Sequence, residues 1–280
     1  MNRKEPAFAH MMAMLSACMD PASLVQEDAA MFQQQYPNQI VTVQDHATQL
    51  RYAWSGQPHL RPLIFVHGSP GSWEGWAHFL LDKELQSKFQ VIAVDRPGYG
   101  GSQPGVTERS ISKQAQAVLL SLQKNTSDLP AILVGHSFGG PVIAKMAIDY
   151  PNKVSGLIFV ASSVDPQFEK MQWVQYPATW WPFRQFIPSK LRVCNEEIMA
   201  LKAELSEMLN QWKDIKSKTV TIHGEDDPLV PVGNVNFLND HLNKNTVLKT
   251  YRIPGLNHFV PWRRPDLIFR GIKDLAVENL

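Results

Sequence analysis

Short, mostly apolar stretches alternate along the chain with longer stretches in which apolar residues recur every three or four positions. The short stretches predict buried strands, and they are residues 62–66, 89–94, 131–134, 154–161, 219–223 and 247–253. The longer stretches predict helices, and they are residues 74–85, 111–124, 141–150, 232–241 and 265–277. Strands that alternate with helices predict an α/β fold, in which a mostly parallel sheet is covered by helices on both faces.

The first two strands have a different pattern. In residues 39–44 and 48–55 apolar and polar side chains alternate, as in a strand with one face exposed to water. Residues 45–47 join them, so we expect an antiparallel hairpin at the edge of the sheet. The α/β domain then spans residues 39–280.

Residues 165–213 interrupt the alternation of strands and helices. They contain several prolines and a helical pattern over residues 195–213. They also contain four of the eight tryptophans, which are Trp173, Trp180, Trp181 and Trp212. We interpret the segment as a short helical cap inserted into the α/β domain.

The first 38 residues form an N-terminal extension with features of a bacterial export signal. Arg3 and Lys4 precede a modest apolar stretch over residues 7–15, and the tetrad Leu-Ser-Ala-Cys ends at Cys18. This tetrad resembles the lipobox of bacterial lipoproteins, which predicts a lipid anchor at Cys18 and a polar tether over residues 20–38. The alternative is an amphipathic helix that buries Cys18. We therefore expect a lipoprotein of the bacterial cell envelope, and a cytoplasmic protein under the alternative.

Composition and charge exclude several classes of protein. Lys and Arg number 27 against 26 Asp and Glu, and the net charge of +1 leaves no basic surplus to bind nucleic acid. No run of about 18 apolar residues is present, so no membrane span is predicted. Two cysteines in 280 residues predict neither a disulfide framework nor a thiolate metal site.

The glycine-rich loop over residues 95–102 follows a predicted strand, as a nucleotide-binding loop would. Its glycines are spaced as G-x-G-G, whereas a dinucleotide-binding loop has the spacing G-x-G-x-x-G and opens directly into a helix. We therefore predict no nucleotide, no metal and no other cofactor. We expect the loop to lie beside the functional site.

The strongest chemical signal is the pentapeptide Gly-His-Ser-Phe-Gly at residues 135–139. It lies between a predicted strand and a predicted helix, and glycines two positions from Ser137 let the two approach closely. Such a turn strains the backbone at Ser137 and exposes its hydroxyl at the end of the sheet. The backbone N–H of Phe138, at the start of the helix, would then bind developing negative charge. These features predict Ser137 as a nucleophile and Phe138 as an oxyanion-hole donor.

A serine nucleophile needs a general base, and histidine is the side chain suited to this role at neutral pH. His258 lies in the loop after the last predicted strand, at the same end of the sheet as Ser137, and is the candidate. A buried carboxylate should orient its imidazole. Asp227, in a loop after the preceding strand, is the favoured acid, and the alternatives are Asp226 and Asp165.

A second oxyanion-hole donor is expected in the loop after residues 62–66. Ser69 is the candidate, because Pro70 has no N–H and the flanking glycines leave room for a close approach. Aromatic residues of this loop and of the cap predict a mainly apolar substrate pocket. The pocket candidates are Trp73, Trp173, Trp180 and Trp181.

Ser137, Asp227 and His258 occur in the chain order of the α/β-hydrolase superfamily, which the sequence resembles over most of its length. The loops His-Gly-Ser-Pro-Gly-Ser-Trp at 67–73 and Asp-Arg-Pro-Gly-Tyr-Gly at 95–100 are similar to those of the branch that contains epoxide hydrolases, dehalogenases and aminopeptidases. Members of that branch that open epoxides or displace halide carry aspartate at the elbow. Serine at this position implies acyl transfer to Ser137, and a cap after the sixth strand is also usual in that branch.

The resemblance and the candidate residues together predict a serine hydrolase that cleaves a small, mainly apolar carboxylic ester through an acyl-enzyme. The expected partner is a small-molecule substrate. An amidase or iminopeptidase and a carbon–carbon bond hydrolase are the enzymatic alternatives. A protein of the same fold that binds a ligand without turnover is the alternative from another class.

Overall fold

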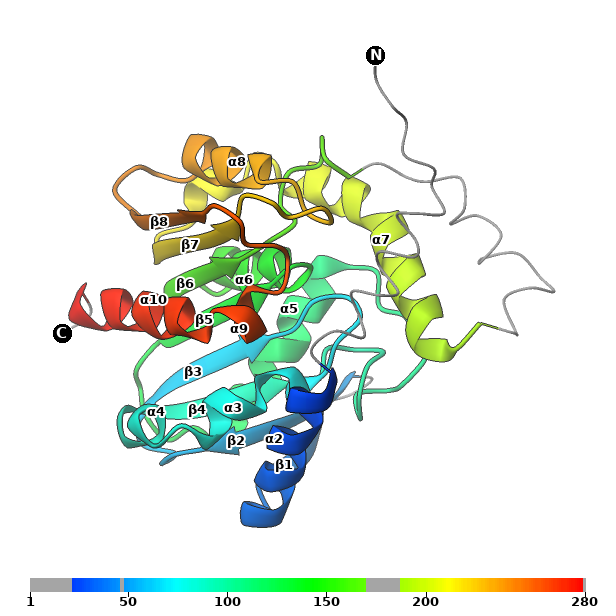
Figure 1. Cartoon of the computed structure of the whole chain (residues 1–280), viewed down its shortest axis with the longest axis vertical. Coiled ribbons are helices and arrows are strands. Elements are labelled where there is room, and N and C mark those ends of the chain that lie inside the picture. The colour runs from blue at the N-terminus through cyan, green and yellow to red at the C-terminus, as the bar shows by residue number, and fades with distance from the viewer. Residues whose placement is uncertain (1–21, 46–47, 170–186, 279–280) are drawn as a thin grey trace.

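The structure is a computed structural model that describes residues 22–45, 48–169 and 187–278. Within these residues an eight-stranded sheet has the order β1-β2-β4-β3-β5-β6-β7-β8 (Figure 1). Its strands are β1 (Ile40–Asp45), β2 (Thr48–Ser55), β3 (Arg61–Val66), β4 (Phe89–Val94), β5 (Ala131–His136), β6 (Val154–Val160), β7 (Lys218–Gly224) and β8 (Val247–Ile253). β2 pairs antiparallel with β1 and with β4, and the remaining pairs of the sheet are parallel. The mostly parallel sheet of an α/β fold is therefore confirmed.

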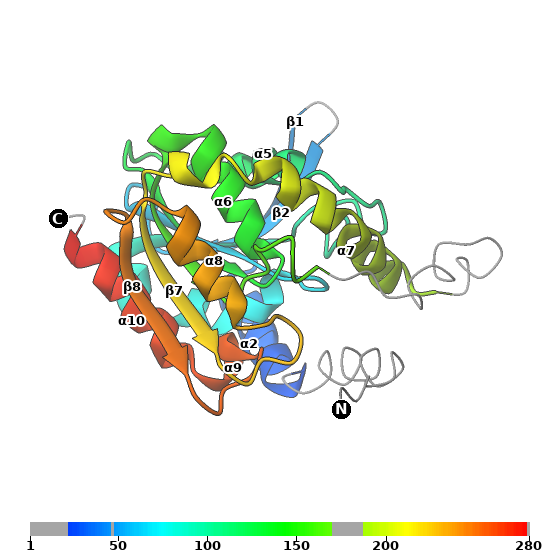
Figure 2. The ribbon, with the colours of Figure 1, turned by 90° about the horizontal axis from the view of Figure 1, so that it is seen from above.

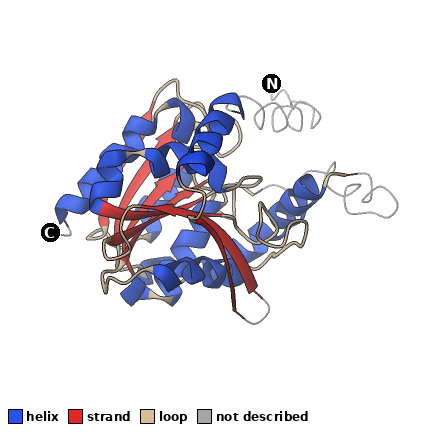
Figure 3. Ribbon diagram, turned by 90° about the horizontal axis from the view of Figure 1, so that it is seen from below, coloured by secondary structure: helices blue, strands red, loops and turns tan. Residues whose placement is uncertain are grey.

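Helices cover both faces of the sheet (Figure 3). The α-helices of the described residues are α2 (Ala22–Gln35), α3 (Ala77–Leu81), α4 (Lys83–Lys88), α5 (Ile111–Leu119), α6 (Gly139–Asp149), α7 (Ser189–Met208), α8 (Gly233–His241), α9 (Val260–Arg263) and α10 (Pro265–Glu278). Short 3₁₀ helices are η1 (Trp73–Trp76), η2 (Leu120–Lys124), η3 (Pro151–Lys153) and η7 (Trp212–Asp214). Side chains of α5, α6, α8 and the end of α7 pack on one face, and those of α2, α3, α4, α9 and α10 pack on the other. Among the helices described, none has the length and apolar character needed to cross a bilayer.

The parallel strands place the loops that carry the candidate residues at one edge of the sheet. β4 and β5, near its centre, are buried along their whole length, as expected for strands covered on both faces. Strands β3 to β8 run in the same direction, so their carboxyl ends share an edge. The loops that follow β3, β4, β5, β7 and β8 therefore meet there, which is where ligands bind in open α/β sheets.

Helix α2 corrects the prediction of a polar tether over residues 20–38. Its side chains Ala29 and Phe32 are buried against the domain, and the ring centroids of Phe32 and Trp73 are 5.6 Å apart. The tether prediction is wrong here because two apolar positions three residues apart are enough to fix a mostly polar helix to the domain. Cys18 lies outside the described residues, and its lipid anchor stays a prediction.

We expect Phe32→Ala to lower the free energy of unfolding by about 3–5 kcal/mol, because it removes a fully buried ring. Met31, on the same helix, is 46 % exposed, and Met31→Ala is the matched control. This control should change the free energy of unfolding by less than about 0.5 kcal/mol. Urea denaturation followed by tryptophan fluorescence measures both variants. Equal losses in the two would contradict the packing of α2 on the domain.

The predicted cap is described mainly through helix α7, whose first turns project beyond the sheet (Figure 2). The chain that follows α7 returns to the core. There Trp212 packs with Phe159 and Phe237, at ring-centroid distances of 6.1 and 5.3 Å. Trp212 is therefore a core residue of the α/β domain, and its interpretation as a tryptophan of the cap is wrong. The other three, Trp173, Trp180 and Trp181, lie outside the described residues.

Candidate active site

Ser137 occupies the turn between β5 and α6. Its φ of 53° lies in the left-handed region, which a residue other than glycine adopts only under constraint. The backbone supplies the constraint: the Ser137 N–H donates to the Val160 carbonyl at 3.0 Å, and the Ser137 carbonyl accepts from the Ser163 N–H at 3.3 Å. A Cβ on Gly135 would lie 2.5 Å from the carbonyl oxygen of Gly139, so the strand and the helix can approach this closely only with glycine there. The strained strand–turn–helix geometry expected around Ser137 is thus present.

His258 and Asp227 meet on the loops that follow β8 and β7. Nδ1 of His258 lies 2.7 Å from Oδ2 of Asp227, and both residues are buried. Oδ1 of Asp227 accepts the N–H groups of Leu229 and Val230 at 2.9 and 2.8 Å. A carboxylate can only accept hydrogen bonds, so Nδ1 of His258 is the donor. In the neutral imidazole, Nε2 then carries the lone pair.

The alternative acids lie elsewhere. Asp226 is exposed to solvent, although it directly precedes Asp227. Asp165 is buried, but its Oδ1 accepts the backbone N–H of Gln167 at 2.8 Å within its own turn. Of the three candidate acids, Asp227 is the one that the structure joins to His258.

His136 links His258 to the serine turn. Nε2 of His136 lies 3.0 Å from the carbonyl oxygen of His258, and the two imidazole centroids are 4.7 Å apart. A carbonyl oxygen can only accept, so Nε2 of His136 is protonated and donates. Because His136 directly precedes Ser137, this hydrogen bond ties the His258 loop to the turn. The three predicted catalytic residues Ser137, His258 and Asp227 therefore gather at the same edge of the sheet.

The loop after β3 lies against Ser137. A Cβ on Gly68 would lie 2.8 Å from the Cβ of Ser137, so glycine is what permits this contact. Ser69 follows, and its Oγ lies 2.6 Å from the Tyr99 hydroxyl. Phe138 directly precedes the first residue of α6. The two residues predicted to offer oxyanion-hole N–H groups are thus both beside Ser137.

Comparison with known proteins supports the fold that the resemblance implied. A family model described as alpha/beta hydrolase fold matches residues 61–186. The chain has the α/β-hydrolase fold. A 1-acylglycerol-3-phosphate O-acyltransferase of Arabidopsis thaliana is 38% identical over 128 residues, which are 42% of this chain and 29% of that protein. The dihydrolipoyllysine-residue acetyltransferase component of the acetoin cleaving system of Cupriavidus necator is 34% identical over 112 residues, which are 40% of this chain and 29% of that protein.

Solved structures share the fold of this α/β-hydrolase over nearly its whole length. The crystal structure of a candidate lipase from Acinetobacter baumannii AYE matches with a TM-score of 0.70 and 18% sequence identity. The match covers 91% of this chain and 96% of that chain. The chain spans a much smaller share, 29%, of the two curated relatives named above.

Burial sets the charges around the site of the α/β-hydrolase. It acts to raise the pKa of Asp227, but the hydrogen bonds from His258 and from the Val230 N–H outweigh it and keep that pKa below its usual value. Burial, together with the nearby His258, lowers the pKa of His136 to about 3. At neutral pH, Asp227 is therefore a carboxylate and His136 a neutral imidazole.

We expect the burial of His136 to make the α/β-hydrolase less stable in mild acid. An unfolded histidine binds a proton near pH 6.5, whereas folded His136 binds it only near pH 3. The stability that neutral His136 contributes is therefore complete above about pH 6.5 and is lost, at about 1.4 kcal/mol per pH unit, as the pH falls toward about 3. Urea denaturation at several pH values in this range should show the free energy of unfolding decreasing as the pH falls. His136→Gln should reduce this slope by the contribution of one proton. An unchanged slope in the variant would contradict this assignment.

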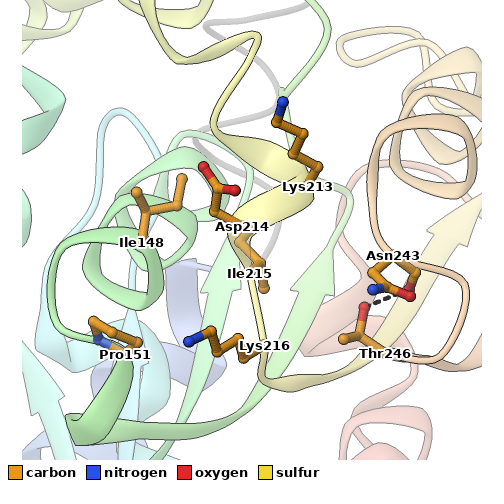
Figure 4. Close-up of a pocket in the computed structure, with 8 residues that line it drawn as sticks. All are labelled: Ile148, Pro151, Lys213, Asp214, Ile215, Lys216, Asn243 and Thr246. Atoms are coloured by element: carbon orange, nitrogen blue, oxygen red, sulfur yellow. Dashed lines mark hydrogen bonds between the residues drawn. The ribbon is translucent and has the colours of Figure 1, made fainter.

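Two cavities differ in their relation to the site. The larger, of about 590 Å³, lies at the opposite edge of the sheet, where its lining residues Pro151, Lys216 and Thr246 precede β6, β7 and β8 (Figure 4). Its lining contains no histidine or cysteine. The smaller, of about 260 Å³, is lined by Tyr99, whose hydroxyl contacts Ser69, and therefore borders the candidate site. Among the described residues, no group of three or more His, Cys, Asp or Glu could hold a metal ion.

Trp73 lines neither cavity. Its side chain is buried and packs against Phe32. Its backbone N–H donates to Oδ1 of Asp95 at 2.8 Å, which joins the loops after β3 and β4. The structure therefore shows a packing role for Trp73, and its role in a substrate pocket stays a prediction.

A buried polar cluster that was not predicted from the sequence lies beside Ser69. Arg96 and Tyr99, from the glycine-rich loop, meet Glu197 of helix α7 there. The glycine-rich loop was expected to lie beside the site, but Glu197 was not expected to bind it. Glu197 occurs in the polar run Asn-Glu-Glu, which in the sequence alone is typical of an exposed helix. Trp262 of α9 was not predicted either, and its ring lies edge-on to His136 with the centroids 5.3 Å apart.

Proposed function

We propose that this α/β-hydrolase is a serine hydrolase that cleaves a small, mainly apolar carboxylic ester through an acyl-enzyme. One observation carries the proposal: Asp227 accepts a hydrogen bond from Nδ1 of His258 on a loop tied to the Ser137 turn. A neutral imidazole with its lone pair on Nε2, at the same edge as a strained serine, is suited to general-base catalysis.

The reaction would follow the order of proton transfers that this arrangement allows. Nε2 of His258 takes the proton of the Ser137 hydroxyl as the serine oxygen attacks the ester carbonyl. The N–H groups of Ser69 and Phe138 bind the oxyanion, and each is worth about 3–4 kcal/mol in the transition state. His258 then gives the proton to the leaving alcohol, and water cleaves the acyl-enzyme through the same two transfers. Asp227 stabilises the imidazolium at each stage.

The choice of bond and of substrate has separate support. The curated relatives have the names of acyltransferases, and an acyl-enzyme can pass its acyl group to water, an alcohol or a thiol. This agrees with acyl transfer to Ser137. The apolar character of the substrate is inferred from the aromatic composition of the predicted cap, with Trp173, Trp180 and Trp181.

Labelling and turnover together test the proposal. We expect a fluorophosphonate probe to form a single adduct, located by mass spectrometry in the peptide that contains Ser137. We also expect turnover of p-nitrophenyl esters, measured across a series of acyl chain lengths, to be highest for short chains. Labelling without turnover of any ester, amide or carbon–carbon substrate would favour a ligand-binding protein. The absence of both labelling and turnover would contradict a serine hydrolase.

A further inference from the structure

A buried arginine fixes the peptide that carries the Ser69 N–H. Arg96 is fully buried in the loop after β4. Its Nη2 donates to the carbonyl oxygen of Gly68 at 2.9 Å, and its Nε donates to that of His67 at 2.9 Å. Nε2 of His67 accepts the backbone N–H of Arg96, so its Nδ1 is the protonated nitrogen and donates to the Gly68 oxygen at 2.6 Å. Two donors therefore hold the Gly68 carbonyl in place.

The Gly68 carbonyl and the Ser69 N–H belong to one planar trans peptide, so they point in opposite directions. A carbonyl held toward Arg96 therefore holds the N–H on the other side of the peptide. Hydrogen bonds to the carbonyl oxygen also polarise the peptide and make its N–H a stronger donor. We propose that Arg96 and Glu197 are a positioning pair that orients the Ser69 N–H toward the oxyanion of the transition state. The inference rests on the proposed function.

Glu197 of helix α7 supplies the charge that allows Arg96 to be buried. Its carboxylate accepts Nη1 of Arg96 at 2.8 Å and Nη2 at 3.2 Å, and both side chains are inaccessible to solvent. It also accepts the Ser69 hydroxyl at 2.6 Å. Further donors to Glu197 are the Tyr99 hydroxyl at 2.8 Å and Nε2 of Gln114 at 2.9 Å. A helix of the predicted cap thus takes part in fixing the loop after β3.

Arg96 also contacts the second predicted oxyanion donor. Its guanidinium carbon lies 4.6 Å from the ring centroid of Phe138, a distance typical of a cation–π contact. One guanidinium therefore supports Ser69 through its peptide and Phe138 through its ring. The oxyanion exists only in the transition state and the tetrahedral intermediate, so loss of this support should lower kcat and leave KM nearly unchanged.

The double variant Arg96→Met/Glu197→Leu tests the pair without leaving a buried charge. Apolar residues of similar volume can replace a buried ion pair with little loss of stability. We expect kcat for p-nitrophenyl butyrate to fall about tenfold to a hundredfold, with KM within about twofold of the wild type. The inhibition constant of a trifluoromethyl ketone, which forms an oxyanion adduct with serine, should rise by the same factor. Thermal unfolding checks that the variant is folded.

Two single variants complete the test. Arg109→Gln is the matched control, because Arg109 is an exposed arginine that pairs with Glu196, the neighbour of Glu197 on α7, and it should leave kcat unchanged. Arg96→Lys keeps the positive charge but loses the forked arrangement of donors, so its kcat should fall as in the double variant. It replaces the double variant in the test if the double variant fails to fold. Wild-type kcat and inhibition constant in the folded variants would overturn the positioning role. A wild-type protein that neither turns over esters nor binds the ketone would overturn the proposed function itself, which distinguishes the two failures.

Discussion

Replacing Ser137 by alanine is expected to lower ester turnover by about a millionfold while leaving the fold intact. The change removes one hydroxyl and keeps a Cβ in the left-handed turn, whose backbone hydrogen bonds do not involve the side chain. Without the hydroxyl, no acyl-enzyme can form, and His258 has no proton to take. Steady-state hydrolysis of p-nitrophenyl butyrate measures the loss, and fluorophosphonate labelling should disappear with it.

The control for this prediction is a serine far from the site. Ser87 is exposed at the end of α4, where its hydroxyl donates to the Glu84 carbonyl, and Ser87→Ala should change neither turnover nor labelling. Equal melting temperatures in the two variants would show that the fold is unaffected. If Ser137→Ala kept turnover within about a hundredfold of the wild type, Ser137 would not be the nucleophile.

The strands could be predicted because a short apolar run or an alternating apolar and polar pattern indicates a strand. The expected strands at residues 48–55 and 89–94 coincide with β2 and β4. The helix expected over residues 74–85 is instead divided into η1, α3 and α4. One polar contact separates α3 from α4: the Asp82 carboxylate accepts the Leu85 N–H at 2.7 Å and starts a new helix. The apolar period continues across this break, so the period alone could not reveal it.

Ser137, His258 and Asp227 lie on loops at one edge of the sheet, and the direction of the strands places those loops there. A serine turn at the end of β5 needs a base and an acid at the same edge, and only a few loops reach that edge. The Arg96–Glu197 pair could not be predicted in this way. Its members are 101 positions apart in the sequence, and a glutamate in a polar helix gives no sign of burial. Such an ion pair forms because the cap helix packs on the loops, and the local sequence around either residue does not indicate this packing.

Replacing Asp227 by asparagine is expected to lower kcat by about ten-thousandfold, with little change in KM. The asparagine oxygen can still accept the N–H groups of Leu229 and Val230, which leaves its NH₂ group facing Nδ1 of His258. An NH₂ group cannot accept a hydrogen bond from Nδ1–H, so the imidazole changes tautomer and carries its proton on Nε2. In that form it cannot take the proton of Ser137. Steady-state kinetics with p-nitrophenyl butyrate at neutral pH measures the effect.

Asp226 is the matched control for this change, because it is the neighbouring aspartate and is exposed. Asp226→Asn changes the net charge by the same amount, yet kcat should stay within about twofold of the wild type, because solvent screens the charge of an exposed carboxylate. A larger loss in Asp226→Asn than in Asp227→Asn would contradict the pairing of Asp227 with His258. Slow fluorophosphonate labelling of a folded Asp227→Asn variant would place the defect in activation of Ser137, because the probe needs the same base but makes different contacts from an ester.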